Sequence, residues 1–186
     1  NSGCANACTG EPGLRDAEAT ASLAAERLGI MASDVMVMST GVIGKRLEMD
    51  KIRRGIGEAV TKLDASVEAG HLAARAIMTT DTRPKEIAVR VSTADGEFVV
   101  AGMAKGAGMI HPNMATMLCL VVTDVPITPA LAQQALRQQV ERSFHMITVD
   151  GDTSTNDTVL LMANGQAQMP MIASADSPAY RDFAEG

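Results

Sequence analysis

The sequence contains very few aromatic residues: no Trp, one Tyr and three Phe among 186 residues. Proteins that hold single-stranded nucleic acid stack its bases on aromatic side chains, and proteins that hold phosphate backbones carry excess positive charge. This chain has neither feature, because its formal net charge is −6 at pH 7. The composition therefore argues against nucleic acid and against an anionic membrane surface as partners.

Long apolar stretches are also absent. No run approaches the ~18–20 residues that a membrane-spanning helix needs, and no basic-then-apolar segment resembles a signal peptide. We therefore expect no membrane partner. The apolar residues that are present, 46% of the chain, include 13 Met and few aromatics, so they predict one sizeable and adaptable core.

The few cysteines and histidines show no metal-binding pattern. Cys4, Cys8 and Cys119 form no C-x-x-C pair, and they are expected to be reduced thiols, which favours a reducing, cytoplasmic location. The histidines are scattered at positions that no ligand spacing explains: His71, His111 and His145. We therefore predict no metal and no other cofactor.

Helical and strand patterns are mixed along the chain. Helical periodicity covers residues 14–28, 49–63, 66–78 and 128–144, and a last helix starts at Ser177. Strand patterns cover residues 35–39, 85–91, 97–103, 117–123 and 158–162, with a hairpin signal at Ala94-Asp95-Gly96. The mixture predicts a layered α/β fold with helices packed on largely antiparallel sheets.

A glycine loop, Thr40-Gly41-Val42-Ile43-Gly44-Lys45, is expected directly after the strand at 35–39. It is not a phosphate loop, because such a loop has four residues between its glycines and a Ser or Thr after the lysine, where this chain has Arg46. Two interpretations remain. The segment is an ordinary turn at a strand end, or its backbone N–H groups stabilise an oxyanion.

Polar residues gather in the segment 149–157, with Asp150, Asp152, Asn156 and Asp157. The spacing does not match a calcium loop, which needs a glycine and a distal glutamate at fixed positions. The pattern favours a loop whose side chains bond their own backbone.

Lys105 lies in the segment 104–108, which predicts a flexible loop, and it is flanked by Gly102 on one side and by Gly106 and Gly108 on the other. A lysine there can hold a carboxylate as a point charge. From spacing alone, an exposed loop lysine without a ligand is the favoured interpretation.

Thr116 stands at the front of an apolar strand, where threonine is ordinary. It becomes a nucleophile only as an N-terminal residue, because its own amine then acts as the base for its hydroxyl. An α-amine has a pKa of about 7.7–8.0, which leaves free amine near neutrality. Spacing alone does not single this threonine out.

Six segments, however, occur in one order along almost the whole chain: residues 1–10, 39–44, 76–82, 105–110, 112–118 and 150–158. Together they resemble the bifunctional ornithine acetyltransferase/glutamate N-acetyltransferase family of arginine biosynthesis. The resemblance implies an Ntn-hydrolase-like fold, an αββα-type layered sandwich with mixed, largely antiparallel sheets.

The resemblance also implies a reaction. The precursor would cleave itself between Ala115 and Thr116 into an α and a β chain. Thr116 would then take the acetyl group of N2-acetylornithine as an ester and pass it to glutamate, a double displacement. An α2β2 heterotetramer is expected, and whether acetyl-CoA also donates acetyl groups stays open.

Site residues carry over from the family one by one. Thr40, through its hydroxyl, and Gly41, through its N–H, would form the oxyanion hole. Thr79 and Lys105 would bind substrate together with Thr116. Cys4 departs from the family pattern, which usually has Asn at this position.

The family's members are considerably longer than this chain. We therefore expect residues 1–186 to be the central portion of one catalytic domain, without the family's N-terminal segment and C-terminal half. Two alternatives stay open: a hydrolase or aminopeptidase-like relative of the same fold that passes the acyl group to water, and a non-catalytic fragment.

Overall fold

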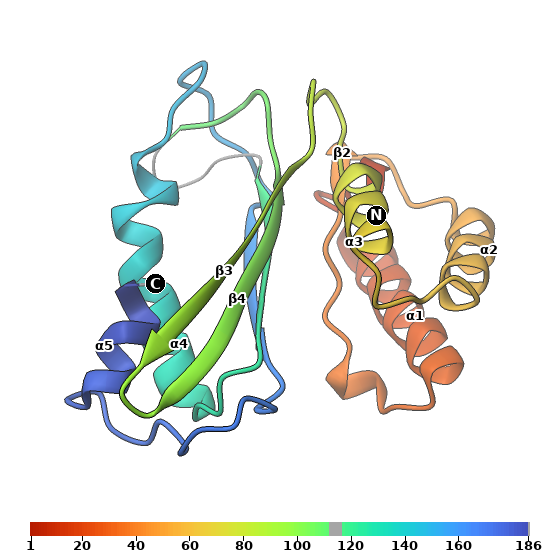
Figure 1. The fold of residues 1–186 in the computed structure, drawn as a ribbon. Coiled ribbons are helices and arrows are strands. Elements are labelled where there is room, and N and C mark those ends of the chain that lie inside the picture. Colours follow the sequence, from red (N-terminus) through yellow and green to blue (C-terminus); the bar gives the residue numbers. More distant parts are fainter. Residues whose placement is uncertain (112–116, 186) are drawn as a thin grey trace. The chain divides into compact units, whose positions relative to one another are not determined.

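The computed structural model describes residues 1–111 and 117–185. The chain forms two compact units, Asn1–Arg83 and Pro84–Gly186, and each is described by itself (Figure 1). The prediction that they belong to one catalytic domain stays a prediction.

The first unit is mainly helical. Its helices are α1 (Gly10–Leu28), α2 (Met49–Val60) and α3 (Val67–Ala76), and α1 packs against α2. Two short parallel strands, β1 (Ser2–Cys4) and β2 (Thr40–Val42), complete it, with a 3-10 turn at Ala32–Asp34.

Local signals set the ends of these helices. Gly29 adopts a left-handed conformation with φ 69° and ends α1 where the sequence predicted. Ser66 caps α3 as expected, because its side chain accepts a hydrogen bond from the N–H of Ala69 at 3.2 Å. Helix α2 ends at Val60, slightly earlier than predicted.

The predicted buried strand at 35–39 is wrong. These residues form no ladder in the described structure, and Met36 and Val37 are 51% and 42% exposed. The strand lies directly after them, because β1 pairs Ser2 with Thr40 and Cys4 with Val42. The predicted glycine loop at 40–44 therefore begins as a strand.

The second unit is built on a four-stranded sheet. The strands are β3 (Lys85–Thr93), β4 (Gly96–Lys105), β5 (Leu118–Thr123) and β6 (Thr158–Ala163), and their order is β3-β4-β5-β6. The first two pairs are antiparallel and β5-β6 is parallel, so the sheet is mixed and largely antiparallel, as predicted.

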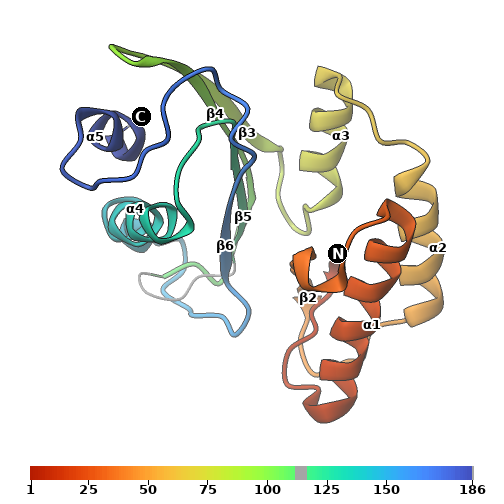
Figure 2. The ribbon, with the colours of Figure 1, turned by 90° about the horizontal axis from the view of Figure 1, so that it is seen from below.

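Helices cover one face of this sheet. Both α4 (Pro129–Arg142) and α5 (Pro178–Glu185) lie on the same side of it (Figure 2). The core between the layers includes Phe98 of β4 and Phe183 of α5, whose ring centroids are 6.0 Å apart. Thr128 caps α4 through the N–H of Leu131, as its Thr-Pro start predicted.

Strand β4 runs further than predicted. Ala104 and Lys105, expected in a flexible loop, pair with Cys119 and Leu118 of β5 and are therefore strand residues. In the described ranges, no helix combines the length and the apolar character needed to cross a membrane.

Candidate active site

The predicted cleavage bond, Ala115-Thr116, lies outside the described residues, and so does the predicted nucleophile. Both assignments stay predictions. The next residue along the chain is described: the backbone N–H of Met117 donates a 2.7 Å hydrogen bond to Oδ1 of Asp157. This bond joins the start of β5 to the end of the polar loop before β6.

Lys105 is the last residue of β4 and is only 2% exposed. The exposed loop lysine that spacing alone favoured is therefore wrong. Glycines on either side suggested a loop, but the ladder with β5 continues through Lys105. A buried ammonium group needs compensating polar or charged neighbours, because leaving water is costly for a charge.

One such neighbour is Asp157. Burial raises the pKa of Asp157 to about 6, although the Met117 N–H and the positive charge of Lys105 both act to lower it. Its Oδ2 atom is buried and has no hydrogen-bond partner among residues 1–111 and 117–185. Lys105 and Asp157 thus place a positive and a negative charge close to the residue that follows Thr116.

The segment 149–157 does more than bond its own backbone. Asp150 accepts hydrogen bonds from the N–H groups of Met109 and Ile110, at 2.6 and 3.0 Å, as well as one from Asp152. Asp157 likewise reaches Met117. The favoured interpretation of a self-contained loop is therefore only partly right. Neither carboxylate was expected at the site, because their partners are about forty residues away.

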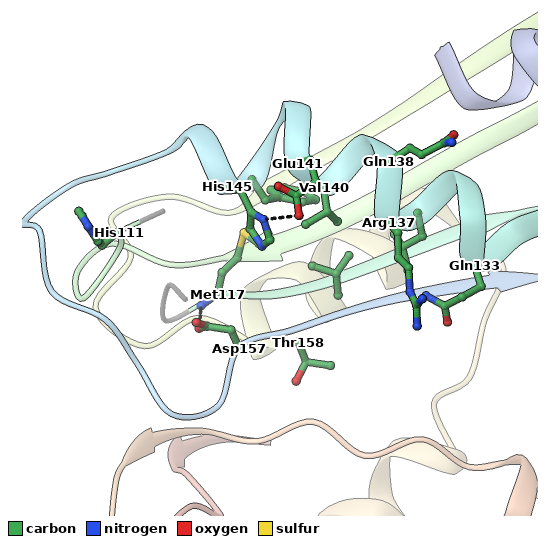
Figure 3. Close-up of a pocket in the computed structure, with 13 residues that line it drawn as sticks. His111, Met117, Gln133, Arg137, Gln138, Val140, Glu141, His145, Asp157 and Thr158 are labelled. Carbon is green, nitrogen blue, oxygen red and sulfur yellow. Dashed lines mark hydrogen bonds and ion pairs between the residues drawn. The ribbon is translucent and has the colours of Figure 1, made fainter. Parts of the chain in front are cut away.

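Met117 and Asp157 also line a cavity of about 590 Å³. Figure 3 shows its opposite wall, formed by side chains of α4 and the following turn, where His145 Nδ1 lies 3.2 Å from Glu141 Oε1. His111 and Arg137 add further polar groups. The volume falls in the range of pockets that bind small molecules.

Thr40 and Gly41 lie in the first unit, on β2. Thr40 is 1% exposed, and its Oγ1 atom is buried with no hydrogen-bond partner in the described part of the chain. A buried unsatisfied hydroxyl is costly and rare in native proteins. The Thr40 hydroxyl is therefore available to donate a hydrogen bond to an oxygen atom of a bound ligand.

Gly41 occupies a position that only glycine fits. Its φ is 129°, and a Cβ atom added there would lie 2.3 Å from the carbonyl carbon of Gly3 on β1. The backbone of Gly41 therefore approaches its neighbour more closely than any other residue permits.

Thr79 follows α3 and is exposed. Its N–H donates to Oδ2 of Asp81 at 3.4 Å, and Asp81 is 9% exposed. The structure thus places Thr79, Thr40 and Gly41 in the first unit, and Lys105 beside Asp157 in the second.

The cysteines are free thiols, and burial raises the pKa of Cys119 to about 11. This thiol is therefore protonated near neutrality and is a poor nucleophile. Residues 1–111 and 117–185 contain no group of three or more His, Cys, Asp or Glu that could hold a metal ion.

Known proteins resemble this chain along its whole length. Residues 1–186 match the ArgJ family. An arginine biosynthesis bifunctional protein ArgJ from Symbiobacterium thermophilum is 55% identical over 185 residues, which are 100% of this chain and 45% of the relative. A mitochondrial protein of that name from Verticillium alfalfae is 51% identical, covering 98% of this chain and 41% of the relative. The chain spans less than half the length of these relatives.

A solved structure agrees with the sequence matches. The crystal structure of the arginine biosynthesis bifunctional protein ArgJ from Bacillus halodurans is 44% identical, with a TM-score of 0.56 over 63% of this chain and 59% of that chain. This likeness confirms the predicted fold class, layered α/β of the Ntn-hydrolase-like type. Since the family match covers every residue and the relatives exceed 50% identity, the resemblance seen in six segments is also confirmed, and the chain belongs to the ArgJ family.

Proposed function

We propose that the protein carrying this chain is an acyltransferase of arginine biosynthesis that moves an acetyl group from N2-acetylornithine to glutamate. The observation that carries the proposal is the family match over all 186 residues. The relatives are named as bifunctional proteins of arginine biosynthesis. Because the chain spans less than half of their length, other parts of the protein would complete the site.

The proposed reaction begins with self-cleavage. The Thr116 hydroxyl attacks the carbonyl carbon of Ala115, the peptide C–N bond breaks, and the acyl group moves to the threonine oxygen. Water then hydrolyses this ester. The products are a carboxylate on Ala115 and a free amine on Thr116, which can serve as a base for the neighbouring hydroxyl.

Acetyl transfer uses the same hydroxyl twice. It attacks the acetyl carbonyl of N2-acetylornithine, and ornithine leaves with its amine protonated. The glutamate amine then attacks the acetyl-threonine ester, and the threonine oxygen recovers its proton. Two moderate steps replace one difficult direct transfer.

Each tetrahedral intermediate carries a negative oxygen that must be stabilised. We propose that the Thr40 hydroxyl and the Gly41 N–H do so, which the orphan Oγ1 atom of Thr40 and the glycine-only position at 41 support. One such donor is typically worth about 10²–10³ in rate. Lys105 would hold a substrate carboxylate with its buried positive charge, and Thr79 would add a further substrate contact.

The proposed assembly is an α2β2 heterotetramer of the two chains produced by cleavage. The proposal includes no cofactor, and it leaves acetyl-CoA as a second acetyl donor to be measured. Cytoplasmic location stays a prediction.

The test uses the complete gene product. Denaturing mass spectrometry should find two chains that divide between Ala115 and Thr116. Incubation with N2-acetylornithine should then release ornithine and yield N-acetylglutamate when glutamate is present. Acetate released at one rate with and without glutamate would instead identify the hydrolase, and a single uncut, inactive species would identify the non-catalytic alternative.

A further inference from the structure

Thr40 and Gly41, the proposed oxyanion donors, lie in a strand of only three residues, β2. Its ladder partner β1 is equally short. Backbone bonds join the two strands, for example from the Thr40 N–H to the Asn1 carbonyl at 3.1 Å. A two-stranded ladder of this size is at best marginally stable by itself, so the position of β2 depends on contacts with the rest of its unit.

The start of β2 is attached to α1 through Ser39 and Asn6. Ser39 directly precedes Thr40, and its Oγ atom accepts the backbone N–H of Asn6 at 2.6 Å. The Asn6 side chain continues to the helix: its Nδ2 donates to the Gly13 carbonyl at 2.8 Å, and its Oδ1 accepts the Thr9 hydroxyl at 2.8 Å. A chain of hydrogen bonds thus runs from the residue before Thr40 to the first turns of α1.

The helix leaves room for this connection at Gly13. This residue is buried, and a Cβ atom added there would lie 2.6 Å from Asn6 Oδ1 and closer still to the Thr9 side chain. Glycine inside a helix lowers the stability of the helix relative to alanine. Its presence therefore fits a position where the backbone of α1 must come close to Asn6.

The residues after β2 are attached to the same helix by an ion pair. Arg46 donates to both carboxylate oxygens of Asp16, from Nη2 to Oδ1 at 2.8 Å and from Nε to Oδ2 at 3.1 Å. The Asp16 side chain is only 8% exposed. A two-point bond of this kind fixes direction as well as distance. Asp16 lies three residues after Gly13 and both are buried, so the two attachments use one face of α1.

We infer that Ser39 and Asp16 are positioning residues, which hold the Thr40 hydroxyl where a tetrahedral intermediate places its negative oxygen. The inference rests on the proposed acetyl transfer and on the oxyanion role of Thr40. The Thr40 Oγ1 atom has no hydrogen-bond partner among the described residues, so no bond of its own fixes it. The backbone that carries it must do so, and that backbone lies between the two attachments to α1. An oxyanion donor works at about 2.7–3.1 Å, and a displacement of about 1 Å can cost on the order of 10²-fold in rate.

A positioning role differs from a purely structural one in the kinetic constants. The negative oxygen develops in the transition state, so misplacing its donor lowers kcat and leaves KM nearly unchanged. A bond that only stabilises the fold changes the unfolding midpoint, and it leaves both constants unchanged while the protein stays folded.

The experiment measures ornithine release by the complete, self-cleaved protein, with each rate divided by the concentration of cleaved chains that mass spectrometry finds. Ser39→Ala loses the acceptor for the Asn6 N–H and should lower kcat about 10-fold or more, with KM within about twofold. Ser39→Thr keeps a hydroxyl on the same carbon and should stay within about threefold of the wild type. Asp16→Asn loses the charge that holds Arg46 and should lower kcat about 5- to 10-fold.

Ser66→Ala is the matched control. The Ser66 hydroxyl also accepts a backbone N–H, that of Ala69 at 3.2 Å, and it lies in the same unit as Ser39. Its removal should lower the unfolding midpoint and leave kcat unchanged.

A double variant shows whether Ser39 acts through Thr40. In Thr40→Val the hydroxyl to be positioned is gone, so adding Ser39→Ala should lower kcat by less than about threefold, against 10-fold or more in the wild-type background. Two independent roles would instead multiply. Asp16→Asn is measured in the same two backgrounds, and it decides the question alone if Ser39→Ala does not fold.

The outcomes separate the possible failures. If the wild type releases no ornithine, the proposed function fails and the inference with it. If Thr40→Val keeps the wild-type rate, the oxyanion role of Thr40 fails. If both of these hold and Ser39→Ala and Asp16→Asn keep the kcat of Ser66→Ala, the positioning role is overturned while the function stands. Equal losses in Ser39→Ala and Ser39→Thr, or full multiplication in the double variants, would also overturn it.

Discussion

Gly41 lies directly opposite Gly3 in the parallel pair of β1 and β2, so closely that a Cβ atom on Gly41 would be 2.3 Å from the Gly3 carbonyl carbon. With φ at 129°, the same position is also strained for any other residue. Two independent features therefore require glycine beside Thr40.

Gly41→Ala should lower the unfolding free energy by roughly 2–4 kcal/mol and abolish acetyl transfer, because it displaces the backbone that carries the proposed oxyanion donor. Calorimetry and an ornithine-release assay measure the two effects. Gly55→Ala is the control: Gly55 lies inside α2 with nothing within 4 Å of an added Cβ, and alanine there should stabilise by about 0.5–1 kcal/mol. A normal rate of acetyl transfer in Gly41→Ala would show that the Gly41 N–H does not stabilise the oxyanion.

Thr40→Val should separate activity from stability. The Thr40 hydroxyl is buried without a hydrogen-bond partner in the described residues, so replacing it with a methyl group removes an unsatisfied group and should leave the unfolding midpoint unchanged or higher. The rate of acetyl transfer should fall about 10²–10³-fold if the hydroxyl stabilises the oxyanion.

Thr123→Val supplies the opposite case. The Thr123 hydroxyl donates to the Val99 carbonyl at 2.7 Å and accepts from the Val125 N–H at 3.2 Å. Its loss should cost about 1–3 kcal/mol of stability and leave acetyl transfer intact. If Thr40→Val lost stability and kept its rate, the hydroxyl would be structural.

Three helix ends of this protein could be predicted because their signals are local. Ser66, Thr128 and Gly29 each act within a few residues of their own position, as a cap or a stop. The strand predicted at 35–39 failed because a ladder depends on a distant partner, and β1 pairs only from Thr40 onward. An apolar run carries no information about where that partner begins.

The candidate site residues came from the family resemblance and not from spacing, and their roles stay predictions. Lys105 is buried and pairs with Leu118 on the neighbouring strand. The glycines near Lys105 suggested a loop, so the sequence did not indicate this pairing. Asp150 and Asp157 accept bonds from residues about forty positions away, which no spacing rule detects. The proposed oxyanion role of Thr40 is supported by a feature that only the structure shows: its hydroxyl is buried and has no hydrogen-bond partner among the described residues.

Substitutions at Thr116 test the nucleophile directly. Thr116→Ala should abolish both self-cleavage and acetyl transfer, because alanine has no oxygen to form either ester. Thr116→Ser keeps a primary hydroxyl and should retain part of each activity. Mass spectrometry follows cleavage, and the alanine variant should carry no acetyl adduct. Full transferase activity in Thr116→Ala would reject the assignment.

The pKa of Asp157 predicts a pH dependence of stability with a definite sign. Burial raises this pKa from 3.8 to about 6, so between these values the folded protein binds more protons at Asp157 than the unfolded chain does. Stability contributed by this group is therefore greatest at low pH and falls as the pH rises from about 4 through about 6. Asp157→Asn, which cannot ionise, should lack this loss. Its unfolding midpoint should exceed that of the wild type above pH 6 by more than it does near pH 4.

The contribution of Asp150 to stability should depend on pH in the opposite direction, and Asp150→Asn tests this. The N–H groups of Met109 and Ile110 lower the pKa of Asp150, so its carboxylate stabilises the fold above its unfolded pKa and loses this contribution as the pH falls. The wild type should therefore exceed Asp150→Asn most at neutral pH. Unfolding midpoints of the three proteins, measured from well below pH 3.8 (the ordinary pKa of Asp150) up to pH 8, test both differences, because subtracting a variant from the wild type removes the contribution of the groups that titrate alike in both. Parallel curves for the wild type and Asp157→Asn would show that Asp157 ionises in the folded protein as it does in the unfolded chain.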